Sequence, residues 1–173
     1  VGTYGGPRQI YNKQMNSSNE DVTAQWIDSY EVINIANNVL SALEVVDEED
    51  RDRVEGEALF LRSLMFFDLV RFFAQQYQSG TAGTQLGIPL VLTPTRGIDE
   101  ESFIPRNTVE EVYNQVIADL ILAASKLPEE NEVYATSGAA NALLARVYLQ
   151  KGDYAKARDA ASSVIESGLY ELL

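Results

Sequence analysis

The chain has 173 residues, of which 46% are hydrophobic and 23% charged, so it is long enough for one domain with a buried core and too apolar to be disordered throughout. Its formal net charge of −13 would repel a phosphate backbone, which makes nucleic acid a poor candidate partner. It contains neither cysteine nor histidine, which excludes disulfides, thiolate metal sites and histidine-dependent catalytic triads.

The N-terminal segment, residues 1–18, is rich in glycine, amides and serine and has no sustained helical period, which predicts a lead-in loop. Nowhere does the sequence contain an apolar run near the roughly 20 residues that cross a bilayer, and its first residues do not have the pattern of a signal peptide. We therefore expect any targeting or anchoring element to lie outside this chain.

A first pair of helices is predicted over residues 19–76. In the first helix, over about 19–46, apolar residues recur at helical spacing and Asn37 interrupts them on the buried side. A buried asparagine usually hydrogen-bonds a backbone group, so we assign Asn37 a structural role. The second helix, over about 49–76, is apolar around most of its circumference, which predicts a helix covered on several sides with its phenylalanines in the core. One of its apolar stripes comprises Val54, Ala58, Leu61, Met65, Leu69 and Phe72.

Residues 77–106 form a connection that is too long for a simple turn, and connections of this length tend to be functional or mobile. The connection contains a short strand-like run at 88–92. A third helix is predicted over 107–127, where Thr108 and Glu111 have the spacing of a capping box.

The segment 136–167 has the pattern of two helices joined by a tight turn. Ala145 and Ala157 place small side chains where the two helices must approach closely. Gly152 lies where the first helix must stop, and Asp153 can cap the second. This hairpin is typical of a tetratricopeptide repeat, although the usual first aromatic residue and the closing proline are absent.

Together these elements predict an all-α fold of tetratricopeptide-like antiparallel helical hairpins with one long irregular loop, in a single partial domain over residues 1–173. Two acidic clusters, at 47–52 and 99–101, lack the alternating oxygen ligands and central glycine of a calcium loop. No pair of carboxylates stands out for glycoside hydrolysis. We therefore expect no catalytic residue, no metal site and no cofactor.

Three tyrosines, in the lead-in and in the long loop, occupy no periodic core position, so their rings are free to stack on a ligand. Asparagines and the glutamines Gln14 and Gln76 near them supply planar amides, which suit polyhydroxylated ligands such as sugars. The candidate ligand-binding residues are Tyr4, Tyr11, Asn12, Asn16, Asn19 and Tyr77. The alternative that the sequence leaves open is that these are ordinary loop residues packed at the rim of the domain.

An ordered series of motifs closely resembles the SusD/RagB family. The series consists of the string at 56–73, the motif Gly87-Ile-Pro-Leu90, the segment 105–113 and the hairpin, and the segment 30–38 looks like the family's usual lead into it. The resemblance covers almost all of residues 22–170 and is more specific than the repeat signature alone.

Members of this family are surface lipoproteins of Bacteroidetes-type bacteria that bind glycans or other nutrients and cap a TonB-dependent outer-membrane transporter. The resemblance implies a non-catalytic component of the cell outer membrane that delivers oligosaccharides to a SusC-like transporter, which the helical repeats contact. It also implies that this chain is a fragment, and that the membrane is reached only through a lipid anchor absent from it. In the family, ligand contacts from this part of the chain come from the polar loop before the first helix, here near residues 11–19. Trp26 follows the apolar stripe and is assigned to the core.

Two other classes of function remain open. A tetratricopeptide-type interaction scaffold would bind a peptide on the concave face of its helices, but that requires three or more regular repeats and only one is clear in this sequence. A glycoside hydrolase is a more distant alternative, because it would have to turn over a glycan without a recognisable acid pair.

Overall fold

The structure is a computed structural model that describes residues 5–16, 18–97 and 103–170. Its helices are α1 (Gly5–Tyr11), α2 (Glu20–Leu40), α3 (Glu48–Phe73), α4 (Val109–Lys126), α5 (Ser137–Lys151) and α6 (Tyr154–Glu166), with a short 3-10 helix, η1, at Leu43–Val45. Within the described ranges the expected strand at 88–92 does not form, and the connection carries only an isolated antiparallel bridge between Leu86 and Thr108. The predicted all-α fold is confirmed.

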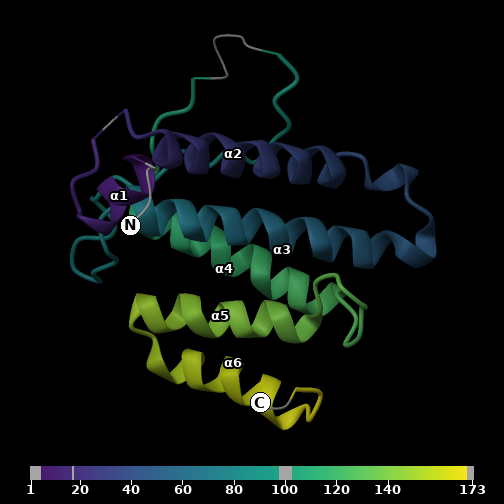
Figure 1. Ribbon diagram of the computed structural model, residues 1–173. Coiled ribbons are helices and arrows are strands. Elements are labelled where there is room, and N and C mark those ends of the chain that lie inside the picture. The colour runs from purple at the N-terminus through teal and green to yellow at the C-terminus, as the bar shows by residue number, and fades with distance from the viewer. Residues whose placement is uncertain (1–4, 17, 98–102, 171–173) are drawn as a thin grey trace.

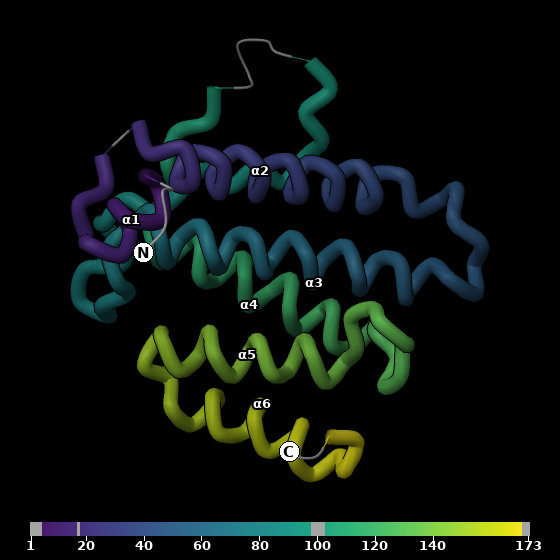
Figure 2. The backbone as a smooth tube through the Cα atoms, in the orientation of Figure 1, coloured from purple at the N-terminus to yellow at the C-terminus, as the bar shows by residue number. Residues whose placement is uncertain are grey.

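The helices from α2 to α6 lie side by side in chain order, so that each packs against its neighbours in the sequence (Figure 1). α2 packs on α3, α3 on α4, α4 on α5, and α5 on α6. This nearest-neighbour arrangement is the one that tetratricopeptide-like solenoids use to bury a continuous core. The connection between α3 and α4 departs from it, because its described parts pass beside α2 and rise beyond it (Figure 2).

The core lies between the stacked helices and is centred on α3. Its largest fully buried side chains include Phe66, Phe67, Ile33, Leu69, Ile88 and Leu120. The assignment of the phenylalanines to the core is confirmed for Phe66 and Phe67, and Trp26 packs against the core as expected. The assignment is wrong for Phe72, which is 62% exposed, and Leu61 of the same predicted stripe is 45% exposed. α3 packs mainly on α2 and α4, so its remaining side faces solvent.

The lead-in is not a loop throughout, as the sequence suggested, because residues Gly5–Tyr11 form α1. The segment has no apolar stripe, and an isolated helix of this length is unstable in water. Its support comes from Asn19, whose Nδ2 donates to the carbonyl of Gly6 at 3.2 Å and to Oε1 of Gln9 at 2.8 Å. A tertiary contact therefore forms a helix that the local sequence does not predict.

The predicted helix over about 19–46 is α2, and it ends earlier, at Leu40. Arg51 of α3 reaches back across the turn between these helices. Its Nε donates to the carbonyl of Leu43 and its Nη2 to that of Val46, each at 3.1 Å. These bonds satisfy carbonyls that a helix would otherwise use, so the chain turns here.

Local capping signals were predicted correctly. Thr108 and Glu111 form the capping box at the start of α4: Oγ1 of Thr108 accepts from the Glu111 backbone N–H at 3.2 Å, and the Thr108 N–H donates to Glu111 Oε2 at 2.7 Å. Gly152 ends α5 with a φ of 82°, in the left-handed region that favours glycine. Asp153 caps α6 by accepting from the backbone N–H of Lys156 at 3.3 Å.

Replacing Thr108 with alanine is expected to lower the free energy of unfolding by about 1 kcal/mol, because the backbone N–H of Glu111 would lose the hydroxyl oxygen that accepts its hydrogen bond. Thr108→Ser should restore most of the loss, and urea titration measures both. The backbone N–H and the hydroxyl of Thr108 also donate to the Glu111 carboxylate, and these bonds hold the pKa of Glu111 below its ordinary value. The stabilisation from Glu111 is therefore present at neutral pH and is lost as the pH falls through that lowered pKa. An unchanged unfolding free energy for the alanine variant would contradict this account of the cap.

Candidate functional site

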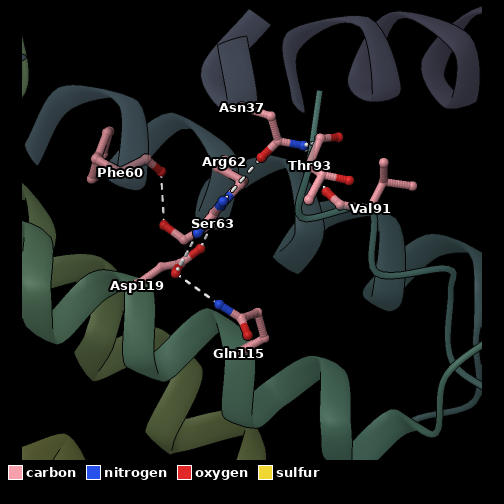
Figure 3. Close-up of polar contacts among 8 residues, drawn as sticks. All are labelled: Asn37, Phe60, Arg62, Ser63, Val91, Thr93, Gln115 and Asp119. Carbon is pink, nitrogen blue, oxygen red and sulfur yellow. Dashed lines mark hydrogen bonds and ion pairs between the residues drawn. The ribbon is translucent and has the colours of Figure 1, made fainter. Parts of the chain in front are cut away.

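A buried polar cluster joins α2, α3 and α4 (Figure 3). Arg62 of α3 and Asp119 of α4 form a bidentate ion pair, with Nε to Oδ2 and Nη2 to Oδ1 both at 2.8 Å. Their side chains are 9% and 5% exposed. Nη1 of Arg62 donates to Oδ1 of Asn37 at 2.9 Å, and Gln115 donates to Asp119 Oδ1 at 2.8 Å. These charged groups are thus paired with one another, and the cluster has a structural role.

The amide nitrogen of Asn37 extends this cluster to the long connection. It donates to the carbonyl of Val91 at 2.8 Å and to that of Thr93 at 3.3 Å. The prediction that Asn37 bonds a backbone group is therefore confirmed, with a partner 54 residues away in the sequence. We call residues 89–95 of the connection the strap.

Two further side chains of α2 hold the strap in the same way. The hydroxyl of Tyr30 donates to the carbonyl of Pro89 at 2.8 Å. The Thr95 N–H donates to Oδ1 of Asn34 at 2.7 Å. With Asn37 these residues lie at helical spacing on one side of α2, so one helix face holds the strap at Pro89, Val91, Thr93 and Thr95. Sequence reasoning missed this face, although polar residues recurring at helical spacing within an apolar stripe were a visible signal.

The candidate ligand residues of the lead-in differ in their surroundings. Tyr11 is 85% exposed, and Asn12 and Asn16 are exposed near it in the chain. Asn19 is only 3% exposed, because its Oδ1 accepts from the Val22 N–H and so caps α2, while its amide nitrogen holds α1. Tyr4 lies outside the described residues. The lead-in therefore presents an exposed ring and two exposed amides, with Asn19 fixing their base.

An open pocket of about 370 Å³ lies where α1 meets the start of α2. It is lined by Gly5, Gly6, Pro7, Gln9, Ser18, Asn19, Glu20 and Asp21. At Gly6 the exposed Asp21 carboxylate lies where a Cβ would be, so α1 and the start of α2 approach closely at this point.

Tyr77 lies with α4 and α5. Its ring is 4.9 Å from that of Tyr113, measured between centroids, and Nζ of Lys151 lies 5.5 Å from the Tyr77 centroid. Burial raises the pKa of Tyr113 to about 12, so its hydroxyl stays protonated near neutral pH and donates to Oε1 of Gln150 at 3.1 Å. Tyr77 is therefore partly buried against the core, in line with the alternative that the sequence left open for it.

Two adjoining pockets lie at the C-terminal end of α3 and share Gln75. One, of about 300 Å³, is lined by Val70, Arg71, Phe72, Gln75, Gln76, Tyr113 and Gln150. The other, of about 380 Å³, is lined by Phe73, Ala74, Gln75, Gln85, Leu86 and Arg106. Both combine glutamine amides, aromatic side chains and a guanidinium, and of their residues only Gln76 was noted from the sequence in connection with a ligand, as an amide near Tyr77. Among the described helices none is long and apolar enough to cross a membrane, and the described residues include no group of three or more acidic side chains placed to hold a metal ion.

The model of a SusD-like family described as starch-binding and associating with the outer membrane matches residues 6–149. The chain belongs to this SusD-like family. SusD-like protein P2 of Formosa agariphila is 31% identical over 170 residues, which cover 96% of this chain and 31% of that protein. A SusD superfamily protein from Bacteroides thetaiotaomicron superposes with a TM-score of 0.87 at 33% identity, over 100% of this chain and 39% of that one.

A solved laminarin-binding SusD-like protein has a TM-score of 0.76 and 27% identity, over 92% of this chain and 33% of that one. The chain thus spans about a third of the length of these SusD-like relatives. The family resemblance seen in the ordered sequence motifs is confirmed.

Proposed function

We propose that the gene product to which this chain belongs is a non-catalytic binder of glycans that delivers them to a SusC-like TonB-dependent transporter. The observation that carries this proposal is the match of residues 6–149 to a starch-binding family associated with the outer membrane. The laminarin-binding relative supports a glycan as the ligand. The proposal includes a surface lipoprotein whose lipid anchor is its only link to the membrane, with the stacked helices facing the transporter.

Within this chain we assign glycan contact to the exposed lead-in residues Tyr11, Asn12 and Asn16. A tyrosine ring that is 85% exposed contributes little to the core, and it offers an apolar face to the C–H groups of a sugar. The neighbouring amides offer directional hydrogen bonds to hydroxyls. Asn19 acts here through α1, because its side chain is used in capping and bridging.

Tyr11→Ala in the full-length gene product is expected to raise the Kd for starch or laminarin about two- to tenfold, the loss expected for one ring contact. Affinity gel electrophoresis measures the change. Tyr134→Ala is the matched control, because Tyr134 is also exposed, at 61%, but lies between α4 and α5. Unchanged affinity in the Tyr11 variant would overturn the lead-in assignment, and failure of the wild-type protein to bind any glycan tested would overturn the function.

The remaining parts of the proposal have their own tests. Co-purification of the tagged protein with a TonB-dependent transporter from detergent-solubilised outer membranes is expected, and its absence would count against the delivery role. Release of new reducing ends from starch or laminarin by the purified protein would contradict a non-catalytic role.

A further inference from the structure

The lead-in, residues 1–18, differs in charge from the rest of the chain. Its only charged residues are Arg8 and Lys13, whereas the whole chain has a formal net charge of −13. The lead-in therefore carries a formal charge of +2 and the remaining residues carry −15. Exposed charges more than about 8–10 Å apart are largely screened at physiological salt. A ligand at the lead-in is therefore influenced mainly by this local positive charge.

Arg8 lies on the side of α1 that faces away from α2. α1 lies at one end of the stack, beside the start of α2 (Figure 1). Gly6 and Gln9 accept hydrogen bonds from the N-cap side chain of α2, so they mark the inner side of α1. Arg8 precedes Tyr11 by three residues and Asn12 by four, and all three are exposed. They therefore share the outer side, where the ring and the amide assigned to glycan contact lie.

The acidic side chains that follow the lead-in lie on the inner side of α1. Glu20 and Asp21 line the pocket between α1 and the start of α2, and the Asp21 carboxylate lies against Gly6. Neither Arg8 nor Lys13 forms an ion pair within the part of the chain that the structure describes. These two cations are therefore available to an anionic group from outside the protein.

The backbone that carries Lys13 is held by two hydrogen bonds. The Lys13 N–H donates to the carbonyl of Ile10 at 3.0 Å, and the Gln14 N–H donates to that of Gln9 at 2.8 Å. This pair of bonds is the Schellman motif that ends many helices. Lys13 has a φ of 54°, in the left-handed region that favours glycine. Strained residues of this kind recur at ligand sites, where a backbone that is already fixed lowers the entropic cost of binding.

Asn16 adds hydrogen-bond donors to this surface. Its Oδ1 accepts from the N–H and the hydroxyl of Ser18, at 3.0 and 2.9 Å, so the acceptor of this amide is already used. The amide nitrogen supplies two N–H groups, beside the donors of Arg8 and Lys13. Carboxylate and sulfate oxygens accept hydrogen bonds and donate none, so they match a surface that is rich in donors and positively charged.

We propose that the lead-in surface binds a glycan whose sugar units carry carboxylate or sulfate groups. Arg8 and Lys13 contact the anionic groups, and Tyr11 stacks on a sugar ring between them. A neutral glycan would use the ring and the amides but would leave both cations unpaired. The inference rests on the proposed glycan-binding function and specifies the class of glycan, with Arg8 as a contact residue that was not among the sequence candidates.

The test compares anionic with neutral oligosaccharides on the full-length gene product. The anionic probes are oligogalacturonate, which carries carboxylates, and a carrageenan oligosaccharide, which carries sulfates, so their two affinities distinguish the two groups. The neutral probes are maltooligosaccharides and laminarioligosaccharides. Isothermal titration calorimetry at low and high NaCl measures Kd. At least one anionic probe should bind more tightly than the neutral probes, and added salt should weaken its binding more than theirs.

Arg8→Gln and Lys13→Asn each remove one positive charge. Glutamine keeps a high helix propensity, and asparagine tolerates the left-handed conformation. Each substitution should raise the Kd for the anionic probe about two- to fivefold, the effect of one exposed ion pair, and should leave that for the neutral probes nearly unchanged. Arg146→Gln is the matched control, because Arg146 is also an exposed arginine but lies on α5. The melting temperature of each variant shows whether its fold is kept.

Weaker binding of the anionic probe in both lead-in variants, with an unchanged control, supports the inference. Equal affinity for anionic and neutral probes, or wild-type affinity for the anionic probe in both variants, overturns it and leaves the glycan function intact. Binding to phosphatidylglycerol vesicles that both variants lose, without any binding of the anionic probes, would assign the cations to a membrane surface and also overturns it. Failure of the wild-type protein to bind any glycan overturns the function and the inference together.

Discussion

Replacing Arg62 with leucine is expected to lower the free energy of unfolding by about 3–5 kcal/mol, because it leaves the Asp119 carboxylate buried without its counter-charge. Asp119 is 4% exposed and would keep only the hydrogen bond from Gln115. Water has little access to the carboxylate, so it would not compensate for the lost guanidinium. The same substitution removes the donor to Asn37. Chemical denaturation of the purified protein, followed by circular dichroism, measures the loss.

The double variant Arg62→Leu/Asp119→Leu separates the cost of leaving one charge unpaired from the net contribution of the ion pair to the free energy of unfolding. Because two apolar side chains leave no buried charge, the double variant should be more stable than Arg62→Leu alone. Arg158→Leu is the control, since its guanidinium, paired with Asp159, is 72% exposed and such pairs contribute little. If Arg62→Leu were no more destabilising than Arg158→Leu, the ion pair would not have the structural role assigned to it.

The features that sequence reasoning predicted are those that depend on neighbours in the chain. Thr108, Gly152 and Asp153 cap helices through groups at most a few residues away, so their residue types at that spacing were sufficient. The order of the motifs likewise predicted the family and the stacked helices. Helix periodicity was less reliable where a helix has more than one buried side, and this is why Phe72 was placed in the core although it faces solvent.

The features that sequence reasoning missed depend on contacts between distant segments. Arg62 and Asp119 are 57 residues apart, and nothing in the local pattern of either helix pairs them. α1 exists because Asn19 bridges to Gly6, which no propensity of Gly5–Tyr11 encodes. Exposed aromatic and amide types could be picked out from the sequence, but which of them share a surface could not.

Replacing Asn37 with leucine is expected to lower the free energy of unfolding by about 2–3 kcal/mol and to loosen the strap, residues 89–95. Asn37 joins the buried cluster to the strap, because its Oδ1 accepts from Arg62 while its amide nitrogen donates to the carbonyls of Val91 and Thr93. Leucine has a similar volume but offers neither group, so a charged donor and two carbonyls would lose a partner at once. Urea titration measures the loss of stability.

Hydrogen exchange at individual amides can show whether the strap itself opens. The Thr95 N–H donates to Asn34 of α2, whereas the Leu90 N–H donates to Asn107 beside α4. In the Asn37 variant, exchange at Thr95 should accelerate more than exchange at Leu90, since the strap would detach from α2 and stay attached near α4. Asn38→Leu is the matched control on the next residue of α2, because Asn38 is exposed and its amide bonds only the Asn34 carbonyl of its own helix. Equal acceleration at both amides would mean that the whole connection opens together, and the α2 face would then not be what fixes the strap.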